Sequence, residues 1–269
     1  MSVKLNFRKL GSGPAFVILH GLYGASDNWI SIAKKLEERF TVYIPDLRNH
    51  GHSPHATTHT FQDMTDDLFR FFNDHAITEA TILGHSMGGK LAMMFAAEYP
   101  ELVKSLIVAD IAPKSYNSVN QTIKSVLQHE LILELMEELN LVAVGSRKEI
   151  DQFLSGKLHD PSLRQFLIKN IHRNKEGYFE WKINVPVLKH GLRSITADVN
   201  SEWFIARQPI LNYPVTFIRG LNSDYISDSD IPAIKTIYPE ARIIDIPDAG
   251  HWLHAEQPEK FIDALLSSI

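Results

Sequence analysis

The sequence predicts an α/β fold: an open, mostly parallel, doubly wound β-sheet that carries one helical cap insertion. Short apolar runs alternate along the chain with stretches whose apolar residues recur at helical spacing, a pattern typical of repeated strand–helix–strand units. The runs are not polar at alternate positions, so both faces of each strand are expected to be buried, as in a parallel sheet. Between residues 113 and 205 the alternation stops and long amphipathic patterns replace it.

The first strand is expected at the edge of the sheet. The segment "VKLNFRKL" alternates polar and apolar residues ahead of a "GSGP" turn, which suits an antiparallel addition. Six apolar runs rich in β-branched residues predict the other strands, at residues 15–19, 41–44, 80–83, 105–109, 215–218 and 241–246. Helices are expected between them, since Phe61, Met64 and Leu68, for example, fall on one helical face. A closing helix is expected over "PEKFIDALLSSI", where Pro258 suits the helix start.

The long middle segment predicts a second subdomain. We expect residues 1–112 and 206–269 to form the core, and residues 113–205 to form a mainly helical cap, or lid, over the ends of the strands. Patterns such as "TIKSVLQHELILELMEELNLVAV" carry the helical signal, and strand signal is weak until "GYFEWKI". A second packing layer with no role in binding is the alternative interpretation of this insertion.

Composition narrows the class of protein. Of the 269 residues, 44% are hydrophobic and 22% charged, which are the values of a globular protein with a sizeable core. A formal charge of −5 gives no electrostatic reason to bind nucleic acid or an anionic membrane. Neither a secretory signal nor an apolar run long enough for membrane insertion is evident, so we expect a cytoplasmic protein, of unknown oligomeric state. Because the sequence has no cysteine, disulfides and thiol nucleophiles are excluded.

The segment "LGHSMGG" predicts a reactive serine. Gly84 and Gly88 bracket Ser86 in the G-x-S-x-G pattern of a nucleophile elbow, a sharp turn from strand to helix that exposes the serine hydroxyl. The pattern alone is common, but here it follows a predicted strand and precedes a helical stretch. An ordinary loop serine is the alternative, and the residues at the other strand ends decide between the two.

A base and an acid follow later strands in the order that such a serine requires. A serine hydroxyl needs a histidine within hydrogen-bond reach and a carboxylate to orient that histidine. His251 lies in "DAGHW", directly after the strand at 241–246, and is the predicted base; His254 is a weaker competitor without a preceding glycine. Asp110 follows the strand at 105–109, whereas Asp224 follows the strand at 215–218. Catalytic groups of open α/β sheets gather at these carboxyl ends.

Backbone amides are expected to hold the negative charge that develops when the serine attacks. The amide of Met87, after the nucleophile, and that of Leu22, in the loop "HGLYG", are the predicted donors of this oxyanion hole. His20 is expected to support that loop through backbone hydrogen bonds. His85, beside the serine, is expected to pack on the other side of the strand.

Taken together, "HGLYG", "DLRNHGHS", "GHSMGG" and "DAGHW" resemble the motifs of the α/β-hydrolase family over essentially the whole chain. More narrowly, "DLRNHGHSPH", "DIAP" and "PDAGHWLHAEQPEKF" resemble the YbfF-type bacterial esterases and their mammalian homologue, the α/β-hydrolase domain-containing protein 11. The resemblance implies the α/β-hydrolase fold and a carboxylesterase or thioesterase that acts on small acyl esters or thioesters, with no metal and no cofactor.

The acid of the site is the one departure from the usual family pattern. Most α/β-hydrolases place it in a G-x-x-D motif, yet the third residue after Gly220 is Ser223, and Asp224 comes one position late. The similar esterases have an aspartate at the position of Asp110 and a serine at that of Ser223. We therefore favour Asp110 as the acid, with Ser223 as a possible fourth member of the site and Asp224 as the reserve.

Two other functional classes share features with this sequence. The histidines of "NHGHSPHATTH" (His50, His52, His55 and His59) resemble a metallo-hydrolase motif, but proline stands where that motif needs aspartate, so no metal site is predicted. A non-catalytic binding protein with this fold is the alternative function, because a fold does not determine activity. Such proteins commonly lack one of the reacting residues, whereas this chain keeps both serine and histidine in their motifs.

Overall fold

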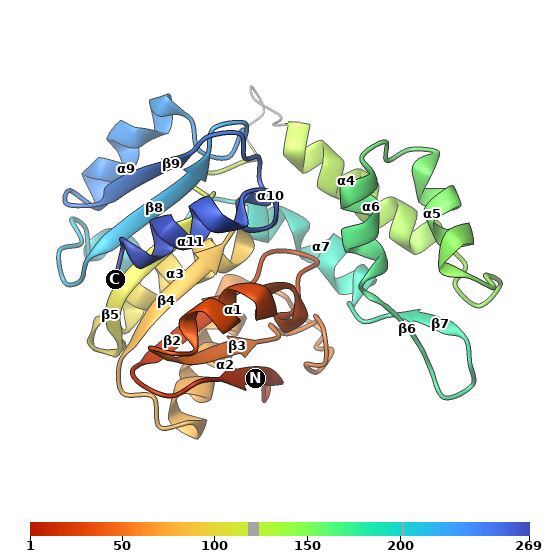
Figure 1. The fold of residues 1–269 in the computed structure, drawn as a ribbon, viewed down its shortest axis with the longest axis horizontal. Helices are drawn as coiled ribbons and strands as arrows, with labels where there is room; N and C mark the ends of the chain where they lie inside the picture. The colour runs from red at the N-terminus through yellow and green to blue at the C-terminus, as the bar shows by residue number, and fades with distance from the viewer. Residues whose placement is uncertain (118–123, 201) are drawn as a thin grey trace.

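The computed structural model describes residues 1–117, 124–200 and 202–269, and its centre is a seven-stranded β-sheet. The strands are β1 (Phe7–Leu10), β2 (Ala15–Leu19), β3 (Thr41–Pro45), β4 (Ala80–His85), β5 (Val103–Ala109), β8 (Val215–Gly220) and β9 (Arg242–Ile246). Their spatial order is β1-β3-β2-β4-β5-β8-β9 (Figure 1). β1 pairs antiparallel with β3 at one edge, and the other neighbouring strands of this sheet are parallel. The predicted fold and its antiparallel edge strand are confirmed.

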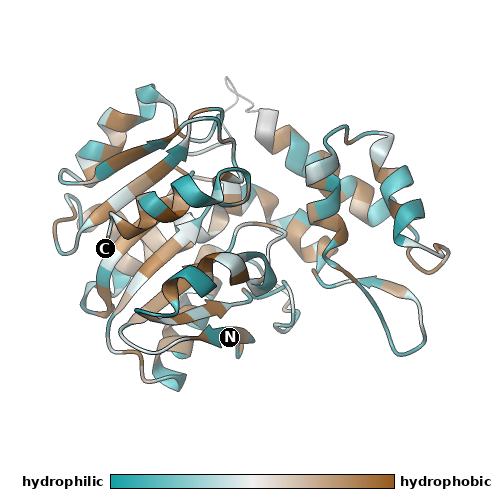
Figure 2. Cartoon of the chain, in the orientation of Figure 1, coloured by the Kyte–Doolittle hydropathy of each residue, from teal (hydrophilic) through white to brown (hydrophobic). Residues whose placement is uncertain are grey.

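Helices cover both faces of this sheet (Figure 1). One face packs against α1 (Ile30–Leu36) and α11 (Pro258–Leu266). The opposite face packs against α2 (Phe61–Asp74), α3 (Met87–Glu98) and α9 (Ile231–Ile237). Short helices between these elements are η1 (Ser26–Trp29), η2 (Pro100–Leu102), η3 (Asp228–Asp230) and α10 (Leu253–Glu256). Figure 2 shows hydrophobic residues along the central strands and mixed hydropathy along the outer helices, which is the pattern of a two-sided core.

The segment between β5 and β8 departs from the sheet. Its elements are α4 (Lys124–Glu138), α5 (Arg147–Ser155), α6 (Pro161–Ile168), β6 (Ile171–Arg173), β7 (Phe179–Trp181), α7 (Val185–Thr196) and α8 (Glu202–Ala206). In Figure 1, α4, α5, α6 and the β6–β7 hairpin project from the side of the sheet. Residues 118–123 and 201 of the predicted cap lie outside the described residues. The sequence indicated β7 but not β6. The two strands pair with each other in an antiparallel hairpin.

Local sequence signals define where several helices begin. The Thr60 hydroxyl accepts a hydrogen bond from the Asp63 amide (3.1 Å) and caps α2, and Ser146 caps α5 in the same way. Such caps satisfy amide groups that have no partner within the first helical turn. Proline at the first position of α6 and α11 leaves no unused amide there.

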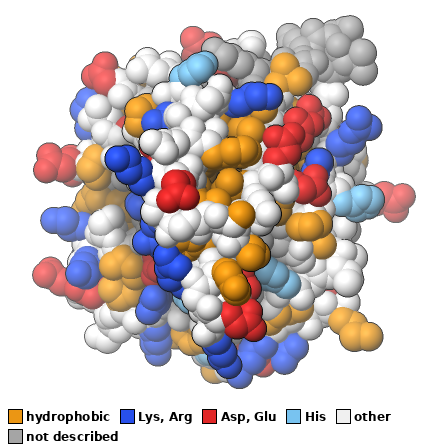
Figure 3. Space-filling model, turned by 90° about the vertical axis from the view of Figure 1, so that its right-hand side faces the viewer, with side chains coloured by type: hydrophobic (Ala, Val, Ile, Leu, Met, Phe, Trp, Pro, Cys, Tyr) orange, Lys and Arg blue, Asp and Glu red, His pale blue; other side chains and the backbone are white. Residues whose placement is uncertain are grey.

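The surface on the α5–α6 side carries side chains of both charges with hydrophobic ones between them (Figure 3). This mixture agrees with the small net charge of the sequence. No helix in the described part of the chain is both long enough and apolar enough to cross a membrane.

Candidate active site

Ser86 lies at the sharp turn where β4 passes into α3. Its backbone has φ 54° and ψ −121°, a strained conformation for a residue with a side chain. The flanking glycines are required by close packing: a Cβ on Gly84 would lie 2.2 Å from the Gly88 oxygen, and one on Gly88 would lie 2.3 Å from the Leu19 oxygen. The G-x-S-x-G motif therefore forms the elbow that the sequence predicted.

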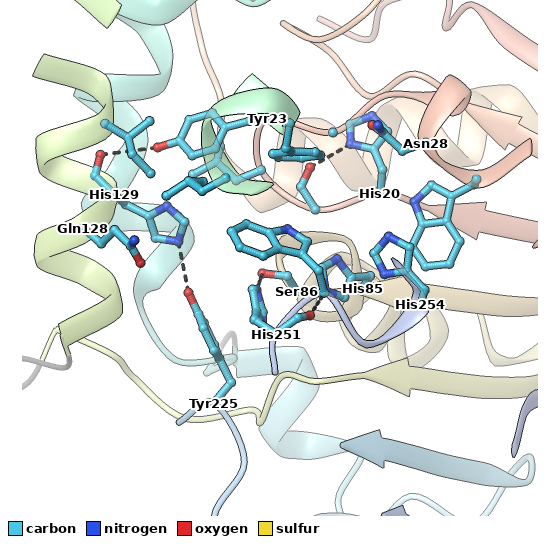
Figure 4. Close-up of a pocket in the computed structure, with 18 residues that line it drawn as sticks. His20, Tyr23, Asn28, His85, Ser86, Gln128, His129, Tyr225, His251 and His254 are labelled. Carbon is cyan, nitrogen blue, oxygen red and sulfur yellow. Dashed lines mark hydrogen bonds between the residues drawn. The ribbon is translucent and has the colours of Figure 1, made fainter. Parts of the chain in front are cut away.

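The elbow brings Ser86 to His251, and His251 to Asp110. The Nε2 atom of His251 lies 3.0 Å from Ser86 Oγ, and its Nδ1 atom lies 2.8 Å from Asp110 Oδ2 (Figure 4 shows the first pair). The three residues are separated by up to 165 positions in the sequence but follow β4, β5 and β9 at the same sheet edge. A hydroxyl bonded to an imidazole whose other nitrogen faces a carboxylate is an arrangement that can activate a serine.

Asp110 is held by further donors from the end of β8. Its Oδ1 accepts a hydrogen bond from the Gly220 amide (3.1 Å), and its Oδ2 accepts one from the Ser223 hydroxyl. The Asp110 side chain is fully buried, whereas the side chain of Asp224, one residue after Ser223, is exposed. The structure thus brings Asp110 and Ser223 together with His251 and leaves the reserve acid at the surface.

Burial governs the protonation of this pair. Removal from water raises the pKa of Asp110, and the hydrogen bonds from Ser223 and Gly220 act in the opposite direction. Burial also lowers the pKa of His251, which favours the neutral imidazole at neutral pH. A neutral His251 that donates from Nδ1 to Asp110 leaves Nε2 free to accept the proton of Ser86.

The loop after β2 carries one predicted oxyanion donor, Leu22, and two histidines shape it. The His20 Nε2 atom accepts from the Leu47 amide (2.9 Å), so its Nδ1–H donates to the Gly21 oxygen (2.8 Å). In the same way, His50 accepts from the Tyr23 amide (3.3 Å) and donates to a neighbouring carbonyl. Burial lowers the pKa of both histidines, which keeps them neutral, and their hydrogen bonds select these tautomers. The second predicted donor, Met87, is the first residue of α3.

Aromatic and histidine rings surround His251. The Tyr225 ring stacks on His251 at a centroid distance of 3.7 Å and an angle of 13°. The prediction that His85 only packs, on the other side of the strand from Ser86, is wrong: it donates from Nε2 to the His251 carbonyl (2.8 Å) and lines the same pocket as Ser86. His254 stacks on Trp29 instead (4.2 Å), away from the serine, which leaves His251 as the histidine bonded to Ser86.

Comparisons with known proteins agree with this fold. The family model described as "alpha/beta hydrolase fold" matches residues 14–131. The sn-1-specific diacylglycerol lipase ABHD11 of Danio rerio is 35% identical over 96% of this chain and 78% of its own length. The chain belongs to the α/β-hydrolase family. The esterase YbfF of Escherichia coli is 31% identical over 93% of this hydrolase and 90% of its own length. A solved marine microorganism esterase superimposes with a TM-score of 0.95, at 44% identity over the whole of both chains.

These relatives place the chain among the esterase- and lipase-type α/β-hydrolases, and a hydrolase acting on ester bonds is the activity they support. The resemblance that the sequence motifs indicated is confirmed.

A pocket opens above Ser86 in this hydrolase (Figure 4). Its walls come from the core loops and from the segment between β5 and β8, which contributes Gln128, His129, Leu163 and Phe166. Most of the lining is apolar or aromatic, as is usual in pockets for small organic ligands. His129 Nε2 lies 3.0 Å from the Tyr225 hydroxyl, so α4 reaches the ring that stacks on the base.

The four loop histidines of the α/β-hydrolase serve separate purposes. His50 supports the loop after β2, and the buried His59 lies 3.4 Å from the sulfur of Met87. His55 faces a carbonyl at the surface, and the His52 amide donates to Asp46. Within the described ranges, histidine and acidic side chains form no group of three or more that could hold a metal ion.

Two residues near the site had no clear sequence signal. Tyr225 lies in a polar loop, where nothing in the pattern distinguishes a ring that contacts the base from an exposed one. His129 lies on α4, whose direction relative to the sheet depends on the tertiary fold. The aromatic character of Tyr225 within "NSDYISDSD" was the one available hint.

Proposed function

We propose that this α/β-hydrolase cleaves carboxylic esters or thioesters through an acyl-enzyme formed on Ser86. The observation that carries the proposal is the hydrogen-bonded chain from Ser86 through His251 to Asp110 at the floor of a largely apolar cavity. The named activities of the relatives support the ester-cleaving part of it. Ser86, His251 and Asp110 act as the catalytic triad, and Ser223 is the fourth member that holds the acid.

In the first step, Ser86 Oγ attacks the acyl carbonyl carbon while its proton passes to His251 Nε2. The carbonyl oxygen becomes an oxyanion, which the amides of Leu22 and Met87 stabilise. When the tetrahedral intermediate collapses, the bond to the leaving group breaks and His251 returns the proton to the departing oxygen or sulfur. In the second step, water attacks the acyl-enzyme with His251 again as base, and releases the acid and free Ser86.

Asp110 orients His251 and stabilises its positive charge after proton transfer. The Ser223 hydroxyl and the Gly220 amide both donate hydrogen bonds to Asp110. These bonds favour the charged carboxylate, whereas burial favours the neutral acid. His20 and His50 fix the loop that carries the Leu22 amide, so that donor is in place before the reaction begins.

Residues 113–205 are proposed to form the cap of the enzyme, with residues 1–112 and 206–269 as its core. Supporting this division, β5 and β8 pair directly across the segment, and α4 and α6 contribute side chains to the cavity above Ser86. The cap excludes water from the reacting groups, and its helices α4 and α6 contact the substrate in the pocket above Ser86.

The first test is intact-mass spectrometry after incubation with a fluorophosphonate, a reagent that traps activated serines. A single adduct that maps to Ser86, absent from the Ser86→Ala variant, is the expected result. Ester hydrolysis by a folded Ser86→Ala variant would reject the acyl-enzyme mechanism. Folded wild-type protein that gives no adduct would favour the non-catalytic, binding-only function.

A further inference from the structure

Two pockets meet at Ser86, and His251 borders one of them but not the other. The first, the His251 pocket, is the pocket described above, and His251, Phe166 and Trp252 are among its walls. The second, the Met87 pocket, has Met87, Ile111, Val126 and Ile195 in its walls. Ser86, Leu22, His129 and Tyr225 border both pockets.

The proposed reaction gives the two pockets different occupants. The carbon under attack has four substituents: Ser86 Oγ, the oxyanion, the leaving group and the acyl chain. The leaving atom must come within hydrogen-bond reach of His251, because that histidine returns the proton. His251 borders the first pocket and is not among the walls of the second. The acyl chain is therefore expected to extend into the Met87 pocket.

The far end of the Met87 pocket is closed by polar groups with fixed partners. Lys90 is 1% exposed, and its ammonium donates to the carbonyls of Lys114 (3.0 Å), Thr196 (3.4 Å) and Ala197. The hydroxyl of Tyr116 accepts from the Ala112 amide (2.9 Å) and donates to the Tyr225 carbonyl (2.7 Å). Moving either side chain aside would leave buried polar groups unpaired, so a longer chain cannot extend the pocket cheaply.

Backbone hydrogen bonds hold the same end of the pocket. The Tyr116 amide donates to the Thr196 carbonyl (2.8 Å), and the Val199 amide donates to the Pro113 carbonyl (3.2 Å). These bonds join the two connections between core and proposed cap, directly behind Lys90. The length limit is therefore set by the rigid attachment of the cap as well as by side chains.

We infer that the Met87 pocket is the acyl subsite, that it selects short acyl chains through Val126 and Ile195, and that the His251 pocket receives a bulkier alcohol or thiol. This inference rests on the proposed function. The substrate class is an ester or thioester of a short, uncharged carboxylic acid: the subsite is walled mainly by apolar side chains, and the cation that borders it already donates to three carbonyls.

The experiment measures kcat/KM for two substrate series. One series keeps p-nitrophenol as leaving group and lengthens the acyl chain from acetyl through butyryl to decanoyl. The other keeps the acetyl group and varies the alcohol from ethyl to phenyl and naphthyl. Wild-type enzyme is expected to favour acetyl or butyryl over decanoyl by at least about tenfold.

The variants separate the two pockets. Ile195→Ala is expected to raise the decanoyl-to-butyryl ratio at least about tenfold, and Val126→Phe to shift preference toward acetyl, with little change in the alcohol series. Phe166→Ala should change the alcohol series and leave the acyl profile as it is. Phe153→Ala removes an aromatic ring of α5 that is 40% exposed and outside both pockets, so both series should match wild type.

The opposite pattern would overturn the inference. If Phe166→Ala lengthens the acyl preference while Ile195→Ala and Val126→Phe do not change it, the two pockets have been assigned the wrong way round. That result would leave ester hydrolysis and the proposed function intact. A wild-type enzyme that hydrolyses no member of either series and forms no Ser86 adduct would reject both proposals.

Discussion

Replacing Asp110 with asparagine tests the least conspicuous member of the site. The two side chains have the same shape, so the substitution changes hydrogen bonding and charge with little change in packing. Oδ1 of residue 110 would keep accepting from the Gly220 amide, which leaves the new NH₂ group at the position of Oδ2. That group faces His251 Nδ1 and the Ser223 hydroxyl.

An NH₂ group donates and cannot accept, so in Asp110→Asn the His251 Nδ1 atom must accept. The imidazole proton then lies on Nε2, and Nε2 donates to Ser86 Oγ in place of accepting its proton. The base is lost although every atom remains near its original position. A wrong tautomer of this kind lowers kcat by about 10⁴, or about 5.4 kcal/mol in the activation barrier.

The assay is kcat for p-nitrophenyl butyrate under saturating conditions, with thermal unfolding of each variant to confirm that it is folded. Asp224→Asn is the matched control: it removes the same charge from an exposed position one residue after Ser223, and kcat should stay within about threefold of wild type. A folded Asp110→Asn enzyme that keeps more than a tenth of wild-type kcat would refute this reasoning. So would a loss of several orders of magnitude in Asp224→Asn alone.

Three further outcomes follow from packing and burial. Ser223→Ala removes one donor to the buried acid and should lower kcat about tenfold; an unchanged kcat would remove Ser223 from the site. Gly88→Ala should reduce the free energy of unfolding, measured by urea denaturation, by more than about 3 kcal/mol. Gly156→Ala is the control: its Cβ would meet no atom closer than 3.4 Å, so the free energy of unfolding should change by less than about 1 kcal/mol. Burial lowers the pKa of His59, His85, His129 and His251 to about 3, so the unfolded chain binds more protons near pH 6.5, and each should cost about 1.4 kcal/mol of stability between pH 7.5 and 5.5. The raised pKa of Asp110 acts in the opposite direction for one group, so the free energy of unfolding should fall over this range; a free energy that rises would contradict the burial of these histidines as neutral groups.

The sheet could be predicted from the sequence because its strands are buried on both faces. Runs such as "AFVIL" leave no amphipathic alternative, and each strand lies where its run predicted. The elbow was equally visible, since Gly84 and Gly88 are demanded by backbone contacts that no other residue can satisfy. Position relative to strand ends then identified the neighbours of Ser86, because parallel strands deliver their ends to one edge.

The remainder of the site depends on distances that no local pattern encodes. Asp110 and Asp224 both follow strands, and only the folded register shows that the first reaches His251 while the second is exposed. Tyr225 and His129 meet through a hydrogen bond between residues 96 positions apart. The placement of α4 over the sheet is a matter of tertiary packing, which an amphipathic pattern alone does not determine.

The narrow connection between core and proposed cap has a consequence for how this chain tolerates change. The segment leaves near Pro113 and returns near Val199, where backbone hydrogen bonds join its two ends, and β5 pairs with β8 as if the intervening residues were a loop. The entropy cost of closing a loop grows only slowly with loop length. Insertions or deletions between Pro113 and Val199 should therefore reduce the stability of the sheet little. Residues there can vary as an exchangeable module, and new substrate preferences can arise without disturbing the register that aligns the reacting groups.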